Sequence, residues 1–235
     1  MIMAKKNNGI RGVQTPAQAI ILSDKSPFMM QEGYKALRTN VAFSLPGTEG
    51  KCIGVTSGNR GDGKSTNSAN VAISFAEVGK KTIILDCDMR IPTVHEKFAV
   101  RSTPGLSDLL VGEAKPSDVL VPARENLDVI PAGRIPKDPT GLLSSKMMVS
   151  LIDKLRSIYD YVILDLPPVT TVTDAAILSP VVDGYLLVVR HMNTEYREVS
   201  EALRLLRMSE GKVLGFIYND APVAQKKYYS NYYYK

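Results

Sequence analysis

The segment GNRGDGKS, residues 58–65, has the residue types and spacing of a loop that binds phosphate. It matches the pattern G-x-x-x-x-G-K-[S/T], in which glycines let successive backbone N–H groups turn toward a phosphate. Lys64 would reach the β- and γ-phosphates of a nucleoside triphosphate, and the Ser65 hydroxyl would ligate Mg²⁺. The pattern therefore predicts binding of ATP with Mg²⁺. The residues expected to contact the nucleotide here are Gly58, Asn59, Arg60, Gly61, Asp62, Gly63, Lys64, Ser65 and Thr66.

Three aspartates close apolar runs that have the character of buried strands. Asp165 ends YVILD, as the aspartate of a Walker B strand does, and Asp86 and Asp88 end TIILDCD. The carboxyl ends of parallel strands gather around the ligand crevice, so we expect these carboxylates beside the phosphates. The predicted metal ligands are Ser65, Asp86 and Asp165, and the predicted catalytic residues are Lys64, Asp86, Asp88 and Asp165.

Strands and helices alternate along the chain around these motifs. Apolar runs predict strands at CIGVT, TIILD, LDVIP, YVILD, GYLLVV and VLGFIYN. Helices are predicted near residues 26–43, 65–78, 147–158 and 194–208, the first with Ser26 as N-cap and Pro27 in its first turn. Continuous apolar strands separated by amphipathic helices predict an α/β fold. We expect a single-domain P-loop NTPase with a mostly parallel sheet covered by helices on both faces.

Length and composition fit one such domain. The chain has 235 residues, of which 44% are hydrophobic and 23% charged. The sequence shows no apolar run long enough for a membrane span and no signal-peptide pattern, and its two cysteines form no C-x-x-C pair. These features predict a cytoplasmic protein. The net charge of +5 comes without the basic stripe of a nucleic-acid-binding surface, so we expect no nucleic-acid partner.

The chain divides into three parts by composition. Residues 1–25 are polar and irregular and predict a flexible N-terminal arm. Residues 26–220 carry the periodic segments and predict the P-loop domain. Residues 221–235, ending YYSNYYYK, have no core-forming pattern and predict a flexible, tyrosine-rich tail. Lysines near both ends suit solvated termini or attraction to an anionic membrane or acidic partner.

Two classes of protein fit these motifs: nucleotide-switched ATPases of chromosome partition and division-site placement, and kinases. From about Gln31 to Asn219, and in the tail, the sequence resembles the bacterial tyrosine kinases of capsule and exopolysaccharide synthesis. The resemblance rests on SGNRGDGKST, on ILDCDMR for the family's L-D-x-D-x-R, and on VILDLPP, with GLSDLL and VTDA as further matches. It implies an ATP-dependent protein-tyrosine kinase, whereas the shared fold leaves the switch ATPase as the alternative.

Three details favour the kinase. Partition-type ATPases carry an extra lysine early in the loop, and that position here is Asn59. The family uses both aspartates of its second motif, and Asp86 and Asp88 are both present. The family also ends in a tyrosine cluster that is its own substrate. The corresponding phosphoacceptors expected in this chain are Tyr228, Tyr229, Tyr232, Tyr233 and Tyr234.

The sequence departs from the family at three positions. Arg60 stands where proline is usual, Ile91 replaces a commonly basic residue, and Gly141 replaces the glutamate of N-P-x-E-L-L. The family's assembly motif E-x-x-R-x-x-R corresponds to Glu32, Lys35 and Arg38, which implies oligomerisation, in a ring with tail exchange, through the first helix. A solvated helix with a local ion pair would give the same spacing.

The resemblance also implies roles and partners. Asp88 would orient the tyrosine hydroxyl, and Asn219 would contact adenine, as in related P-loop proteins. The family's single-domain members depend on a transmembrane polysaccharide co-polymerase that activates them. We therefore expect such an activator to recruit this chain to the inner face of the cell membrane, and a cognate tyrosine phosphatase to reverse its phosphorylation.

Overall fold

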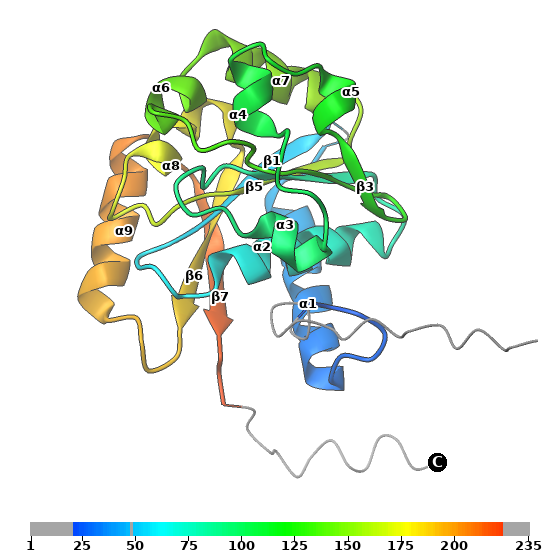
Figure 1. Ribbon diagram of the computed structural model, residues 1–235. Coiled ribbons are helices and arrows are strands. Elements are labelled where there is room, and N and C mark those ends of the chain that lie inside the picture. Colours follow the sequence, from blue (N-terminus) through cyan, green and yellow to red (C-terminus); the bar gives the residue numbers. More distant parts are fainter. Residues whose placement is uncertain (1–20, 48, 223–235) are drawn as a thin grey trace, which may run out of the picture.

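The computed structural model describes residues 21–47 and 49–222 (Figure 1). This part of the chain forms a seven-stranded sheet in the order β3-β4-β2-β5-β1-β6-β7. All neighbouring strands are parallel except β3, which pairs antiparallel with β4. The strands are β1 (Lys51–Ser57), β2 (Thr82–Asp86), β3 (Val121–Arg124), β4 (Leu127–Ile130), β5 (Tyr161–Asp165), β6 (Gly184–Arg190) and β7 (Val213–Asn219). The predicted mostly parallel sheet is confirmed.

Helices cover both faces of the sheet, as predicted (Figure 1). One face carries α1 (Phe28–Ser44), α2 (Lys64–Ala76) and α3 (Val94–Phe98). The other carries the short helices α4 (Leu106–Leu110), α5 (Pro116–Val119), α6 (Pro139–Leu143) and α8 (Asp174–Ile177), a 3₁₀ turn at Ser179–Val181, and the longer α7 (Lys146–Arg156) and α9 (Tyr196–Met208). Within the described residues, no helix is long and apolar enough to span a membrane.

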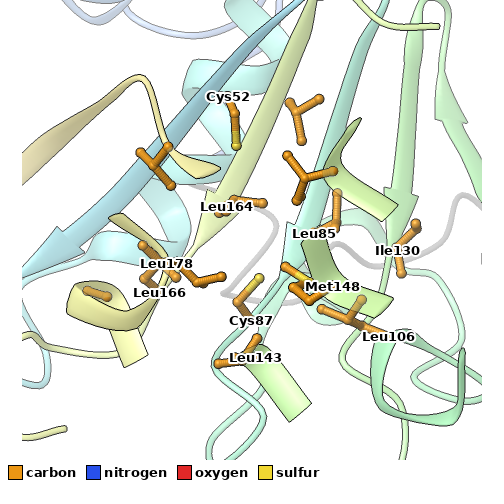
Figure 2. Close-up of a cluster of buried hydrophobic side chains, with 14 of the residues drawn as sticks. Cys52, Leu85, Cys87, Leu106, Ile130, Leu143, Met148, Leu164, Leu166 and Leu178 are labelled. Atoms are coloured by element: carbon orange, nitrogen blue, oxygen red, sulfur yellow. The ribbon is translucent and has the colours of Figure 1, made fainter. Parts of the chain in front are cut away.

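Successive side chains of the central strands point to opposite faces of the sheet, and both faces are buried, which explains why these strands have continuous apolar sequences. In β2, Ile83 and Leu85 pack into one core and Ile84 into the other. The same alternation occurs in β5, where Leu164 joins the core of α4–α9 that Figure 2 shows around Cys87. A parallel strand covered on both faces has no solvated side, so both sets of its side chains are apolar. The rigid layer that results ends at its carboxyl edge in the predicted aspartates.

The described fold starts earlier than the boundary expected at residue 26. Ile21 and Leu22 are buried, the Leu22 N–H donates to Asn70 Oδ1 at 2.8 Å, and Arg124 Nη1 donates to the Leu22 carbonyl at 2.8 Å. This stretch belongs to the packed domain because two apolar side chains and two hydrogen bonds fix it. Residues 1–20 of the predicted arm and residues 223–235 of the predicted tail lie outside the described residues.

Two local predictions differ from the structure. Ser26 does not cap α1: the helix begins at Phe28, and Ser26 closes a turn through a hydrogen bond from its N–H to the Ser23 carbonyl at 2.9 Å. Strand β3 was not predicted. Its four residues contain Pro122, and a proline without an N–H fits an edge strand but weakens the sequence signal for any strand.

Tyr185 joins the sheet to helix α8 through a buried hydrogen bond. It is fully buried in β6, and its hydroxyl donates to the Ala175 carbonyl of α8 at 2.7 Å. We expect Tyr185→Phe to lower the free energy of unfolding by about 1–2 kcal/mol, because a buried carbonyl loses its donor. Urea denaturation measures this loss. Tyr196→Phe, at a position 87% exposed, is the matched control and should change stability by less than about 0.5 kcal/mol; equal effects of the two variants would contradict the assignment.

Candidate nucleotide and phosphoryl-transfer site

The predicted phosphate loop joins the carboxyl end of β1 to the start of α2, near the middle of the sheet. Gly61 and Gly63 have φ values of +90° and +92°, a region that side chains with a Cβ rarely adopt. A Cβ at Gly63 would also lie 2.3 Å from Asn219 Nδ2. Conformation and space therefore both require glycine at Gly63. The loop leads directly into a helix of 13 residues, whose N-terminus favours an anion.

Asp62 braces this loop from inside. Its side chain is fully buried, and Oδ2 accepts a hydrogen bond from the Asn59 N–H at 3.1 Å. Its Oδ1 accepts from Asn193 Nδ2 at 3.1 Å and from Thr194 Oγ1 at 2.9 Å. The sequence placed Asp62 among the nucleotide-binding residues, whereas these contacts engage both carboxylate oxygens within the protein. Asn193 and Thr194 were missed, because nothing local marks two polar residues in the loop after β6.

The ends of β6 and β7 hold the loop backbone. Asn219 Nδ2 donates to the Asp62 carbonyl at 2.9 Å, and Arg190 Nη1 donates to the Gly61 carbonyl at 2.9 Å. Asp220 lies against Arg190, with Oδ2 2.7 Å from Nε. The adenine contact suggested for Asn219 stays a prediction, and in this structure its amide positions the phosphate loop.

Asp86 and Asp165 are register partners at the ends of β2 and β5, and both are fully buried. Ser68 Oγ donates to Asp165 Oδ1 at 2.8 Å, whereas Asp165 Oδ2 has no hydrogen bond among the described residues. Burial raises the pKa of Asp165, although the charge of Lys64 and the nearby Ser65 and Ser68 hydroxyls oppose the rise. A buried carboxylate oxygen without a partner, beside the Ser65 hydroxyl, fits a Mg²⁺ ion.

Asp86 has a different environment. Its Oδ2 accepts from the Thr93 and Val94 N–H groups at 3.1 and 3.0 Å, and its Oδ1 accepts from the Asp88 N–H at 3.2 Å. Burial and the charge of Asp165 hold its pKa well above the usual range, against the opposing Val94 N–H. Asp86 thus organises the loop after β2 and the start of α3. Since its oxygens already have backbone partners, Asp165 is the better placed of the two for direct contact with a metal.

Lys64 is the cation that balances this group. Its Nζ lies 2.8 Å from Asp88 Oδ2, with both side chains nearly buried. Burial lowers the pKa of Lys64, but Asp165, Asp88 and Asp86 together raise it more, so the net shift is upward and the ammonium is stabilised. The structure therefore brings all four predicted catalytic residues together at the carboxyl ends of the central strands.

A second polar network, which the sequence did not reveal, lies beside the site. Arg90 pairs with the fully buried Asp174, and the Thr140 hydroxyl accepts from Arg90 Nη2 at 2.9 Å and donates to Asp174 Oδ1 at 2.9 Å. Arg90 is two residues beyond Asp88, so this network fixes the loop that carries Asp88. In the sequence, ILDCDMR and VTDA were noted as matches to the family and the segment around Gly141 as a departure, but the contact of Arg90 with Thr140 and Asp174 was not predicted.

The remaining predicted residues have local contacts. On α1, Glu32 Oε1 lies 2.8 Å from Lys35 Nζ, and Arg38 Nη1 donates to the Ser74 carbonyl of α2 at 2.6 Å. The Glu32–Lys35 contact is the local ion pair of the alternative, whereas Arg38 joins α1 to α2. Assembly through α1 stays a prediction. The five tail tyrosines lie outside the described residues. Within residues 21–47 and 49–222, no three His, Cys, Asp or Glu side chains group to hold a metal alone. Mg²⁺ would therefore depend on nucleotide oxygens and water as well as on the protein.

Sheet order, phosphate loop and strand-end carboxylates define the chain as a P-loop NTPase. A family model described as "ParA: NUBPL iron-transfer P-loop NTPase" matches residues 49–233. The putative tyrosine-protein kinase CapB of Staphylococcus aureus is 35% identical over 98% of this chain and 99% of its own length. The tyrosine-protein kinase YwqD of Bacillus subtilis is 36% identical over 97% and 95%.

A solved structure gives the same answer at the level of coordinates. The crystal structure of the chimerical protein CapA2B2 superposes with a TM-score of 0.81 at 36% identity, covering 88% of this chain and 90% of that one. The chain belongs to the bacterial tyrosine kinases represented by these relatives. Nucleotide with Mg²⁺ is the general ligand of this P-loop class, and the residues present fit it.

Asp165→Asn should raise thermal stability without nucleotide while weakening the Mg²⁺ dependence of nucleotide binding. The variant removes one of three carboxylates gathered around a single lysine, and it removes a possible metal ligand. We expect a melting temperature higher by a few degrees, since 1 kcal/mol corresponds to roughly 2–4 °C in a domain of this size. Thermal melts and titration of a fluorescent ATP analogue, with and without Mg²⁺, measure both effects. The exposed Asp153→Asn is the control. A lower melting temperature for Asp165→Asn would contradict the idea that repulsion among the three carboxylates destabilises the fold.

Thr140→Val keeps the shape of the side chain but removes the hydroxyl that links Arg90 to Asp174. We expect nucleotide affinity to stay within about twofold, while phosphotransfer slows about three- to tenfold, because the loop carrying Asp88 loses hydrogen bonds worth about 1 kcal/mol. Thr140→Ser should restore the rate. Parallel loss of affinity and rate, without rescue by serine, would show that the network acts only on folding.

Proposed function

We propose that this protein is an ATP-dependent protein-tyrosine kinase that phosphorylates its own C-terminal tyrosine cluster in trans and regulates capsular or exopolysaccharide synthesis and export. The observation that carries the proposal is the contact of Lys64 with Asp88 at 2.8 Å. Lys64, which would hold the γ-phosphate, lies beside a carboxylate that comes from the loop after β2, outside the phosphate loop. This is the place where an acceptor hydroxyl would meet the phosphate.

Each residue has a task in this reaction. The backbone N–H groups of the phosphate loop and Lys64 hold the β- and γ-phosphates, and Ser65 and Asp165 hold Mg²⁺. When bound, Mg²⁺ neutralises charge that develops on the phosphate oxygens. Asp86 keeps the loop after β2 folded around the site. Asp88 accepts a hydrogen bond from the tyrosine hydroxyl and orients its oxygen toward the γ-phosphorus.

In the transfer, the bond between the γ-phosphorus and the β,γ-bridging oxygen breaks, and a bond to the tyrosine oxygen forms. ADP leaves, and the phenolic proton passes to Asp88 or to water. A carboxylate is a much weaker base than a phenolate, so orientation is the main role of Asp88. A loose transition state demands little early proton removal, which makes orientation sufficient.

Nucleotide binding would also switch the site on. In the structure, Lys64 Nζ donates to Asp88 Oδ2 at 2.8 Å. A γ-phosphate offers Lys64 a second, more highly charged partner and thereby frees Asp88 for the acceptor. The acceptor site is complete in this scheme only when ATP is present, which would limit futile binding of tyrosine to an empty enzyme.

The acceptors we propose are Tyr228, Tyr229, Tyr232, Tyr233 and Tyr234. The tail lysines carry about +3, and five phosphotyrosines at about −1.5 to −2 each would take the tail to about −5 to −7. We propose that unmodified tails enter neighbouring subunits of an oligomer, assembled through Glu32, Lys35 and Arg38. Full phosphorylation would then expel the tails from the acidic, ATP-bearing site.

The same proposal includes three partners or settings. A transmembrane co-polymerase would activate the kinase and bring it to the inner face of the membrane, and a tyrosine phosphatase would reset the tail. The family resemblance supports these partners, together with a relative structure that is itself a chimerical protein named CapA2B2. A partition-type switch ATPase would share the fold, but Asn59 occupies the position of its second lysine.

Lys64→Met tests the function directly. Incubation with γ-labelled ATP and Mg²⁺, with and without a candidate activator segment, followed by phosphotyrosine mapping, should show label in residues 228–234 of the wild type. The variant should lose at least about a hundredfold of this label, since the residue that contacts the transferred group is gone. The exposed Lys80→Met is the matched control and should keep wild-type labelling.

A second variant separates the two classes of function. With all five tail tyrosines changed to Phe, a kinase would still bind Mg·ATP but lose its tail label. For the first variant, Lys64→Met, undiminished tail label would refute the assignment of the nucleotide site. ATP hydrolysis with ATP-driven dimerisation in the Phe variant, and no tail phosphotyrosine in the wild type, would establish the switch ATPase.

A further inference from the structure

A cavity of about 470 Å³ lies away from the nucleotide site and is lined by the segment before α1, the start of α1, α3 and the edge strand β3. Its volume falls within the range of roughly 300–1,000 Å³ of small-ligand sites. The lining residues are Ile21, Ser23, Lys25, Ser26, Pro27, Met30, Lys97, Phe98, Ala123 and Arg124. This set contains three cationic side chains and no carboxylate.

The three cations of this cavity are not neutralised by their neighbours. Among the described residues, Lys25, Lys97 and Arg124 form no salt bridge within 4.0 Å. Each cation has an acidic sequence neighbour, namely Asp24, Glu96 and Glu125, and all three are exposed and do not line the cavity. Arg124 spends one nitrogen, Nη1, on the Leu22 carbonyl. The remaining guanidinium edge and both ammonium groups are available to an anion.

A second groove of the described chain has fewer unpaired cations. It runs along α9 and is lined by Arg204, which lies 2.6 Å from the Glu201 carboxylate, and by Arg207, which forms no salt bridge among the described residues. One unpaired cation therefore lines this groove, against three in the cavity beside β3. The cavity beside β3 also sits at the start of α1, where the first turn holds no acidic residue and no side chain caps the helix. The positive end of this helix adds to the attraction for an anion.

The cavity has an apolar wall as well as a charged rim. Ile21 is 6% exposed, and Met30, Phe98 and Ala123 are half-buried beside it. A small inorganic anion would leave this wall unused. An anion carried on a flat apolar ring would use both parts, with the ring against Met30 and Phe98 and the charge among the cations. Arginine forms paired hydrogen bonds with phosphate, and lysines add point charges.

We propose that this cavity binds phosphotyrosine, specifically the phosphorylated C-terminal segment of this chain, an inference that rests on the proposed kinase function. Each phosphotyrosine brings about −1.5 to −2 charges and a ring, which match the rim and the wall. The cavity would then read the product of the reaction at a place distinct from the catalytic edge. A tail expelled from a phosphorylated assembly would have a site to occupy.

The length of the segment allows this contact. Pro222, the last described residue, follows β7 at one edge of the sheet, and the cavity lies at the other edge beside β3. Six strand spacings of about 4.8 Å separate these edges by roughly 29 Å. Arg124 pairs with the first residue of β4, whereas Pro222 follows the last residue of β7, so an offset of about 15 Å along the strands raises the direct separation to roughly 33 Å. Residues 223–234 extend to roughly 40 Å, so the last tyrosines can span this direct distance within one molecule or reach the cavity of a second copy.

A chemically synthesised peptide tests the proposal independently of the kinase. The probe is a fluorescent peptide of residues 222–235 with phosphotyrosine at 232–234, titrated against the full chain with all five tail tyrosines changed to Phe. Saturating Mg·ADP blocks the phosphate loop. Anisotropy should show binding at least tenfold tighter than for the unphosphorylated peptide and weakening with salt. The Lys25→Gln/Lys97→Gln variant should lose at least tenfold in affinity, because it removes two of the three cations that line the cavity. It should stay folded, because neither lysine forms a salt bridge among the described residues.

Matched controls and competing outcomes are built into the design. The exposed pair Lys80→Gln/Lys137→Gln removes the same charge elsewhere and should bind as the parent does. Equal affinity for both peptides, or full affinity in the Lys25/Lys97 variant, would overturn the proposal without touching the kinase. Loss of label in the kinase assay would in turn leave this measurement intact.

Binding of the phosphopeptide to the autophosphorylated wild type shows whether the cavity is filled by the tail of the same molecule or of a second copy. If its own tail fills the cavity, the phosphopeptide is excluded at every protein concentration. If the tail of a second copy fills it, exclusion grows with concentration and sedimentation shows a dimer. Both results support the site, whereas an autophosphorylated wild type that binds the phosphopeptide as well as the Phe variant would refute occupation by the tail.

Discussion

Three carboxylates held around one lysine are the constraint on which this structure depends. Asp86 and Asp165 are fully buried, Asp88 is nearly so, and Lys64 is the shared cation. Removing charges from water is expensive unless they are paired, so this arrangement costs free energy that other contacts of the fold must offset. The fold reduces the strain by giving Asp86 three backbone donors and Asp165 a serine hydroxyl. The second oxygen of Asp165 has no hydrogen-bond partner among the described residues, and it is the atom that we propose as a ligand of Mg²⁺.

The rest of the site keeps this charged group in position from two sides. On one side, Asp62 and the ends of β6 and β7 fix the phosphate loop that carries Lys64. On the other, Arg90, Thr140 and Asp174 fix the loop that carries Asp88. The two supports share no residue. The loop that carries Lys64 and the loop that carries Asp88 can therefore be adjusted separately, which would suit the proposed kinase because it must hold ATP while successive acceptor tyrosines bind and leave.

Sequence predicted well what is local in the chain. The phosphate loop, the strands ending in Asp86 and Asp165, and the mostly parallel sheet follow from spacing and periodicity within a few residues. The supports were missed because they join distant positions: Asp62 meets Thr194 across 132 residues, and Arg90 meets Thr140 across 50. The nucleotide contact expected of Asp62 stays a prediction. That its side chain hydrogen-bonds within the protein was missed, because a position inside a nucleotide-binding motif does not reveal which way the side chain faces. Burial of Ile21 and Leu22 escaped prediction because two apolar residues show no periodicity.

The contact between Lys64 and Asp88 connects stability to activity. This pair satisfies two nearly buried charges that would otherwise be unpaired. In the proposed reaction, a phosphate that draws Lys64 away would leave Asp88 in need of a donor, and a tyrosine hydroxyl is a donor. Binding of ATP would then favour binding of the acceptor, because the phosphate takes over the charge of Lys64 and the hydroxyl hydrogen-bonds to Asp88. This order of binding would follow from electrostatics in a low-dielectric site. The strands hold the carboxylates, and in this scheme only the lysine changes its partner.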